Sequence, residues 1–194
     1  MSQRLQSTFT FAASPQRVAD MLVSQEFADR AAADMEAIEH RVEPGSDTLT
    51  VWNVVPSPDK MKRIVGKEME IKQTTSWEPW AGDGSRRGHI QVLVEKMKTV
   101  LEGEMTLTGD DAASTVVYDS QLTIDIPILG PKLEESAVDS FADILAATQQ
   151  IGDGWLAEQA EMADAEEADG TAAAAAEPAE SAPAEGAASD STAA

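Results

Sequence analysis

The spacing of apolar residues changes once along the chain, near Pro127. From about Leu49 to Ile126, apolar side chains recur at every second position in several segments, as in strands with one buried face. Pro127 and the Gly130-Pro131 pair then interrupt the pattern. From Leu133 to Leu156, apolar residues recur at spacings of three and four, which predicts one long amphipathic helix.

The clearest alternation lies between Lys67 and Trp77. Its odd positions hold mostly apolar side chains and its even positions hold polar ones, so we expect a strand with one solvated face. The odd positions are Met69, Ile71, Gln73, Thr75 and Trp77. Strands over residues 88–94, 96–107 and 114–126 follow after short turns. Such a series predicts an antiparallel meander, which tends to curl.

The N-terminal part predicts one strand and two short helices. Residues 5–11 alternate between apolar and polar side chains and indicate a half-buried strand. Ser14-Pro15 supplies an N-cap followed by proline at the first helical position, so a helix is expected as far as Val23. A second short helix is expected from Ser24 or Gln25 to Ala33. Residues 35–42 are ambiguous but favour a strand, residues 49–55 predict another, and 61–65 fit one helical turn or a bend.

Together these elements predict an α+β domain with a curved antiparallel sheet of about six or seven strands. The last helix is expected to cover the concave face of this sheet, an arrangement that often leaves a cavity between helix and sheet. The helix stripe containing Phe141 and Leu145 would form the roof of that space.

Composition divides the chain at about residue 157. The last 38 residues include 17 alanines and 10 acidic residues, and none of them is basic or aromatic. Such a segment cannot bury enough apolar surface to offset its chain entropy, so we expect a disordered acidic tail at 157–194 after a domain at 1–156. Residues 157–168 contain good helix formers and can alternatively extend the preceding helix.

Charge limits the range of partners. The formal net charge is −21, which argues against non-specific binding of nucleic acid. Between Lys60 and Lys98, however, nine bases face five acids. This positive patch suits an anionic ligand, a membrane or the acidic tail, although ordinary solvated strand faces are the simplest interpretation. No apolar run reaches membrane-spanning length and no signal-peptide core is present, so we expect a cytoplasmic protein with at most transient membrane contact.

The sequence shows no convincing catalytic, metal or cofactor motif. It has no cysteine, which excludes thiolate chemistry and disulfides. The glycines at 82, 84 and 88 have the wrong spacing for a dinucleotide loop and indicate a hairpin turn. His40 and His89 lie in strand-like segments without a surrounding motif. Asp125 fits either a buried acid or, more simply, the solvated face of its strand. We therefore expect no catalytic residue, no metal and no cofactor.

Tryptophan and methionine are the more suggestive residues. The chain has four tryptophans and eight methionines but only one tyrosine. Broad rings and flexible thioethers suit an adaptable apolar cavity, and they equally suit ordinary core packing. Gln73 and Thr75 share a face with apolar residues, while Thr99 and Tyr118 lie on similar faces. Inward polar groups need a partner, which can be a ligand, a buried water or another side chain.

Several segments carry a family resemblance. They are residues 11–18 (FAASPQRV), 66–71 (GKEMEI), 74–77 (TTSW) and, most specifically, 124–134 (IDIPILGPKLE). Over about residues 3–157 the chain resembles a START-like family of actinobacteria that is designated a domain of unknown function. The START-like superfamily includes polyketide cyclases and lipid-transfer domains. The resemblance implies a helix-grip fold with an internal apolar cavity, and it brings no catalytic motif.

Three functions remain open at this point. The first is binding or transfer of a hydrophobic small molecule, such as a lipid, isoprenoid or polyketide-like compound, in the cavity. Its candidate wall residues are Trp52, Met69, Gln73, Trp77, Met105, Tyr118, Phe141 and Leu145. The second is a cyclase or dehydratase that uses His89 or Asp125 as an acid or base. The third is a regulatory module acting through its surface and tail. The sequence gives no oligomeric state.

Overall fold

The computed structural model describes residues 2–57, 59, 62–94, 96, 98–124 and 146–163. Its elements are β1 (Ser2–Phe11), α1 (Pro15–Leu22), α2 (Gln25–Asp34), β2 (Glu39–Pro44), β3 (Thr48–Pro56), α3 (Lys62–Val65), β4 (Glu68–Trp77), β5 (Arg86–Val94), β6 (Thr99–Gly109) and β7 (Ser114–Ile124). Residues 146–163 form the C-terminal helix. The chain divides into two compact units, Met1–Gln159 and Ala160–Ala194, and the architecture described below belongs to the first.

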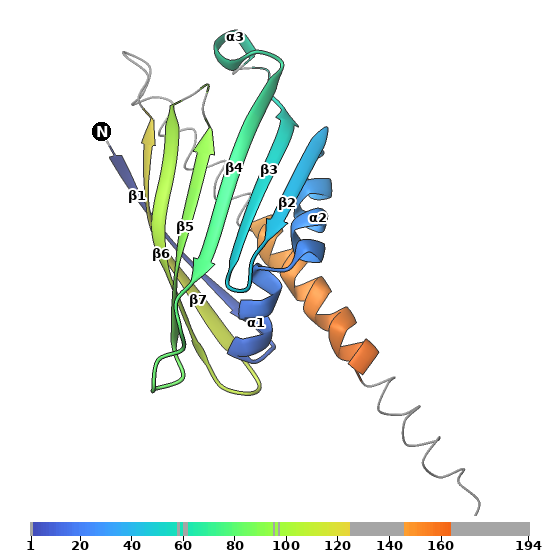
Figure 1. The fold of residues 1–194 in the computed structure, drawn as a ribbon, viewed down its shortest axis with the longest axis vertical. Coiled ribbons are helices and arrows are strands. Elements are labelled where there is room, and N and C mark those ends of the chain that lie inside the picture. The colour runs from blue at the N-terminus through green and yellow to red at the C-terminus, as the bar shows by residue number, and fades with distance from the viewer. Residues whose placement is uncertain are drawn as a thin grey trace, which may run out of the picture. The chain divides into compact units, whose positions relative to one another are not determined.

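The strands of the described residues form one antiparallel sheet in the order β1-β7-β6-β5-β4-β3-β2. Strands β2 to β7 follow one another as a meander, and β1 returns to pair with β7 along the other edge (Figure 1). This arrangement confirms the predicted curved sheet, the two short helices after the first strand and the C-terminal helix.

Both short helices begin at serine caps, and the cap at Ser14 was predicted from the sequence. The Ser14 hydroxyl accepts the backbone N–H of Arg17 at 3.5 Å, and the Ser24 hydroxyl accepts that of Phe27 at 3.2 Å. Helix α1 packs against β6 and β7, whereas α2 packs against β2 and β3. We call the sheet face that these helices cover the inner face, and the opposite face the outer face.

The largest apolar core lies on the inner face, at the end of the sheet where β1 ends. Its members come from β1, α1, the central strands and the C-terminal helix; they include Phe9, Phe11, Val18, Met21, Leu107, Val116 and Leu156. Burying side chains of this size contributes about 1.5–3 kcal/mol each. The core therefore fixes both α1 and the C-terminal helix against one end of the sheet.

A glycine allows the C-terminal helix to approach this core closely. A Cβ atom on Gly152 would lie 2.9 Å from Phe11 Cε1 and 3.1 Å from Met21 Cε. These distances are shorter than the roughly 3.5–4.0 Å of a favourable carbon contact, so any side chain at this position displaces its neighbours. One helical turn later, Leu156 is buried and its carbonyl oxygen accepts Nη2 of Arg17 at 3.4 Å.

The C-terminal helix continues to residue 163 and does not end near Leu156, where we expected it to stop. Good helix formers in this segment and an ion pair with α2 account for the difference. Arg30 Nη2 lies 2.6 Å from Glu158 Oε2 and 2.8 Å from Glu26 Oε1. Trp155 Nε1 also donates to Glu26 Oε2 at 3.0 Å. The segment at 127–131 that interrupts the pattern, the predicted helix start at 133–145 and the tail from 164 lie outside the described residues.

Other boundaries shift by a few residues. The ambiguous segment at 35–42 becomes a strand only at Glu39, because α2 continues to Asp34 and Glu36 adopts a left-handed turn conformation with φ of 52°. Residues 62–65 form the single helical turn α3 rather than a bend.

Candidate functional site

The candidate site is the central part of the inner face, where β4 supplies a row of side chains. Strand β4 places Met69, Ile71, Gln73, Thr75 and Trp77 on this face, because residues two apart in a strand point to the same side. Burial increases along the row: Met69, Ile71 and Gln73 are half-buried, whereas Thr75 and Trp77 are buried. The alternation in the sequence therefore identifies this face correctly.

Three of the predicted wall residues meet in one cross-strand row. Trp77 pairs with Gly88, Gly88 with Met105, and Met105 with Tyr118. Gly88 makes the row possible, since a Cβ there would lie 2.6 Å from Trp77 Cε3 and 2.8 Å from Met105 Cε. The missing side chain leaves room for the indole and the thioether to cover the glycine backbone. We call Trp77, Met105 and Tyr118 the inner triad.

The inner triad carries two polar groups within an apolar setting. Trp77 Nε1 is buried and has no hydrogen-bond partner among the described residues. Tyr118 packs edge-on against Phe9, with ring centroids 5.3 Å apart, and burial raises the pKa of its hydroxyl. The row can therefore offer an indole N–H and a neutral phenol O–H to a hydrogen-bond acceptor.

Further polar groups lie along the same face. Gln73 Nε2 donates weakly to Thr75 Oγ1 at 3.4 Å. Asn53 is buried on β3, and its Oδ1 has no partner among the described residues. Unpaired buried polar atoms are uncommon in proteins and call for an explanation such as a ligand or a trapped water.

The apolar residues around these groups are only partly covered. They are Leu5, Met69, Ile71, Ile90, Val92, Val94 and Tyr118, all of which are half-buried. The same face is fully buried towards Phe11, where the core and α1 lie against it. Tyr118 shows the contrast most clearly, because its ring packs against Phe9 and yet part of the residue stays accessible.

The remaining predicted wall residues divide into three cases. Met69 and Gln73 lie on the inner face, on the same strand as Trp77. Phe141 and Leu145 lie outside the described residues. Trp52 lies on the outer face, so the structure corrects its predicted position.

The position of Trp52 follows from the register of β3. Val51, Asn53 and Val55 of this strand are buried against the inner side, which turns Trp52 outward. Its ring lies between two cross-strand neighbours, with Arg41 Cζ 4.6 Å and Lys72 Nζ 5.2 Å from the ring centroid. These cation–π contacts stabilise the Trp52 ring on the outer face.

Several residues of the inner face were not singled out from the sequence. We assigned Gly88, together with Gly82 and Gly84, to a hairpin turn. Gly88 instead lies in a strand directly opposite Trp77, and a glycine at such a position often marks a close approach of neighbouring side chains. Ile90 and Val92 lie two and four residues after Gly88 on β5, and this alternation could have placed them on the same face as Gly88. Asn53 stands out only as a polar residue in phase with Val51 and Val55.

The two histidines lie at exposed positions on different strands. His89 is exposed on the outer face, with Nε2 3.1 Å from Glu78 Oε1, and His40 is exposed beside Asp29 at 3.0 Å. An acid or base at His89 would therefore face away from the inner triad. Asp125 lies outside the described residues. Within the described part of the chain, no group of three or more acidic, histidine or cysteine side chains is arranged to hold a metal ion.

The outer face has an open polar groove of about 740 Å³ across β1 and β4–β7. Several of its side chains bond to one another. Arg4 Nε donates to Asp119 at 2.8 Å, and Gln91 Nε2 donates to Glu102 at 2.6 Å. In the described residues no helix has the length and apolar character needed to span a bilayer.

Comparison with known proteins agrees with this architecture. The family described as "Protein of unknown function (DUF2505)" matches residues 6–156, whereas no curated protein matches the chain. Among solved structures, the protein TTHA0849 from Thermus thermophilus is similar with a TM-score of 0.53 and 14% identity, covering 77% of this chain and 96% of that one.

Two further structures resemble the chain at similar levels. The di-domain ARO/CYC StfQ from the steffimycin biosynthetic pathway has a TM-score of 0.59 at 13% identity, covering 83% of this chain and 53% of StfQ. Human STARD10 has a TM-score of 0.53 at 11% identity, covering 76% of this chain and 62% of STARD10. Such low identities show a shared fold alone. The chain belongs to the DUF2505 family, and its fold is the START-like helix-grip fold.

Proposed function

We propose that the protein binds or transfers a hydrophobic small molecule, such as a lipid, isoprenoid or polyketide-like compound, between the inner face and the C-terminal helix. The inner triad carries this proposal. Trp77 and Met105 are buried, and Trp77 carries an indole N–H that has no partner among the described residues. Tyr118 stays partly accessible, as do the apolar residues of β4 and β5 around the triad. Sites for small molecules typically combine an apolar lining with a few polar groups of this kind.

The polar groups suggest one property of the ligand. Trp77 Nε1 is a donor only, and the neutral Tyr118 hydroxyl can also donate. The two groups lie three strands apart, so a ligand with a carbonyl, ether or hydroxyl oxygen at two points of an otherwise apolar skeleton would satisfy both. A purely hydrocarbon ligand would leave the indole N–H unpaired.

The proposal is tested first by native mass spectrometry and organic extraction of the full-length protein as purified. We expect a copurified apolar compound, or binding of added fatty acids, isoprenoids or aromatic polyketides. Ile90→Trp should fill the central inner face and abolish this binding. Gln91→Trp is the matched control, since the neighbouring residue lies on the outer face and bonds to Glu102.

Trp77→Phe tests the polar contact separately. It removes the N–H while keeping a large ring, so we expect affinity for an oxygen-containing ligand to fall about tenfold, as for the loss of one hydrogen bond. Equal binding by the wild type, Ile90→Trp and Gln91→Trp would contradict the site. Equal binding by the wild type and Trp77→Phe would contradict only the predicted oxygen contact.

A further inference from the structure

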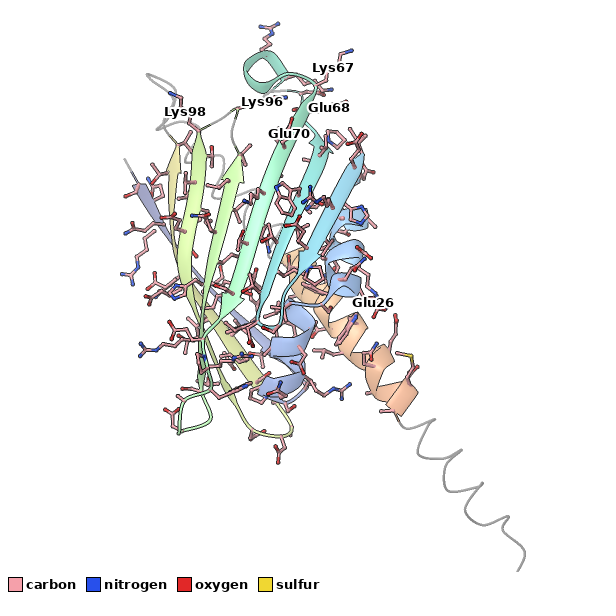
Figure 2. All side chains as sticks on the ribbon, viewed as in Figure 1. Glu26, Lys67, Glu68, Glu70, Lys96 and Lys98 are labelled. Atoms are coloured by element: carbon pink, nitrogen blue, oxygen red, sulfur yellow. The ribbon has the colours of Figure 1, made fainter. Side chains whose placement is uncertain are left out.

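A group of exposed cations lies at one end of the sheet. These residues come from two connections, β3–α3–β4 and β5–β6; they are Lys62, Arg63, Lys67, Lys96 and Lys98. Strands β3 and β5 end where β4 and β6 begin, so both connections lie at the same end of the sheet. Figure 2 shows Lys67, Lys96 and Lys98 there, beside Glu68 and Glu70. We call the five cations the basic rim.

Within the described part of the chain, carboxylates pair with only two of the five rim cations. Lys62 Nζ lies 2.6 Å from Asp59 Oδ1, and Lys96 Nζ lies 4.0 Å from Glu70 Oε1. Arg63, Lys67 and Lys98 have no ion pair with any described residue. By contrast, the arginines that pair with carboxylates elsewhere include Arg4, Arg30, Arg41 and Arg86.

The rim contrasts with the charge of the whole chain. The formal net charge is −21, yet among the described residues the two connections and the first three residues of β4 hold five cations against three acids, which are Asp59, Glu68 and Glu70. Because surface charges are screened within about 8 Å at physiological salt, a partner that touches this end meets mainly the rim. A strongly acidic protein with one basic end should approach an anionic surface in a single orientation.

The sequence around the cations favours a lipid surface among anionic partners. In residues 60–67 (KMKRIVGK) and 95–98 (EKMK), cations alternate with Met61, Ile64, Val65 and Met97. Mixed basic and apolar composition is typical of segments that lie in a membrane interface. A soluble polyanion would gain nothing from the apolar residues.

The acidic tail is the competing occupant of the rim. Residues 164–194 supply acidic side chains but no leucine, isoleucine, valine, methionine or aromatic residue. They therefore match the charge of the rim but not the apolar residues that lie between its cations in the sequence, whereas a bilayer with anionic lipids matches both.

We propose that the basic rim docks the protein on bilayers that contain anionic lipids. This surface is independent of the ligand proposed for the inner face, because docking needs only the cations of the two connections. It also gives those connections a shared role, since Arg63 and Lys67 come from one and Lys98 from the other.

The test is co-flotation of the full-length protein with vesicles. Vesicles of phosphatidylcholine alone are compared with vesicles of phosphatidylcholine and phosphatidylglycerol in equal amounts. We expect binding only to the anionic vesicles, weakening as salt rises. The variant Arg63→Gln/Lys67→Gln/Lys98→Gln should lower the partition coefficient about 100-fold, as three interfacial cations are lost.

A matched control shows whether binding depends on the rim cations themselves or only on the net charge of the protein. Arg17→Gln/Arg41→Gln/Arg87→Gln removes the same charge from α1, β2 and the start of β5, away from the rim, and should bind like the wild type. Thermal melts check that both triple variants fold. Failure of the wild type to bind anionic vesicles overturns the proposal, and so does equal loss in both triples. Rim-dependent binding of DNA in the absence of vesicle binding also overturns it.

Discussion

Gly152 and Gly154 provide a matched pair for testing how the C-terminal helix docks. Both lie in the described helix, but Gly152 is buried against the core whereas Gly154 is exposed. A Cβ on Gly154 would have no heavy atom within 4 Å. Gly154→Ala should therefore stabilise the protein by about 1 kcal/mol, the difference in helix propensity between the two residues.

Gly152→Ala gains the same propensity but meets a steric obstacle. Its new methyl would lie 2.9 Å from Phe11 Cε1 and 3.1 Å from Met21 Cε. The end of Met21 can move, whereas the Phe11 ring is only 2% exposed and is held by the core. Overpacking of this kind costs about 1–3 kcal/mol, so Gly152→Ala should be less stable than Gly154→Ala by that amount.

Urea unfolding followed by circular dichroism and tryptophan fluorescence measures both variants. We expect the midpoint to rise for Gly154→Ala and to stay level or fall for Gly152→Ala, with unchanged slopes. A Phe11→Leu background should reduce the difference, because the smaller side chain relieves the contact. If both alanine variants were equally stabilised, the helix would not approach Phe11 at residue 152 and our account of the core would fail.

Three further predictions follow from individual contacts. A hydrogen bond from Arg30 and its charge hold the pKa of Glu158 below the usual range of a glutamate. The pair therefore stabilises the fold above the carboxyl pKa of the unfolded chain, and this stabilisation is lost as pH falls through the lower carboxyl pKa of the folded protein. Carboxyl NMR titration should show the pKa of Glu158 rising in Arg30→Gln. Tyr118 is the only tyrosine of the chain, and burial raises the pKa of its hydroxyl. Absorbance at about 295 nm should therefore show no phenolate near pH 10 until the protein unfolds. Titration with the ordinary pKa of a free tyrosine would show that the Tyr118 hydroxyl is not buried. Gly88→Ala should destabilise the protein by about 1–3 kcal/mol by displacing Trp77, with a shift in tryptophan emission that the exposed Gly82→Ala does not show.

Much of the fold could be predicted because single segments carry clean periodicities. The alternation in β4 identifies its inner side without ambiguity, and the serine caps fix the starts of α1 and α2. The inner triad was anticipated as three wall residues, although only the register shows that they meet in one row over Gly88.

Trp52 illustrates where such reasoning fails. Strand β3 has apolar residues on both faces, so its alternation does not indicate which face is buried. Pairing with β4 settles the question, because Val51 lies opposite Gln73 and Trp52 lies opposite Lys72. The cations that cover Trp52 come from two other strands and become its neighbours only after the sheet forms.

The pairing of the first strand with the last has a consequence for biosynthesis. Strand β1 pairs with β7, and roughly 100 residues separate the two in the chain. At typical translation rates, roughly 5 to 20 s pass between their synthesis. Throughout that interval the nascent chain carries Phe9 and Phe11 on a strand without its partner, so the completed sheet can form only after β7 has emerged from the ribosome.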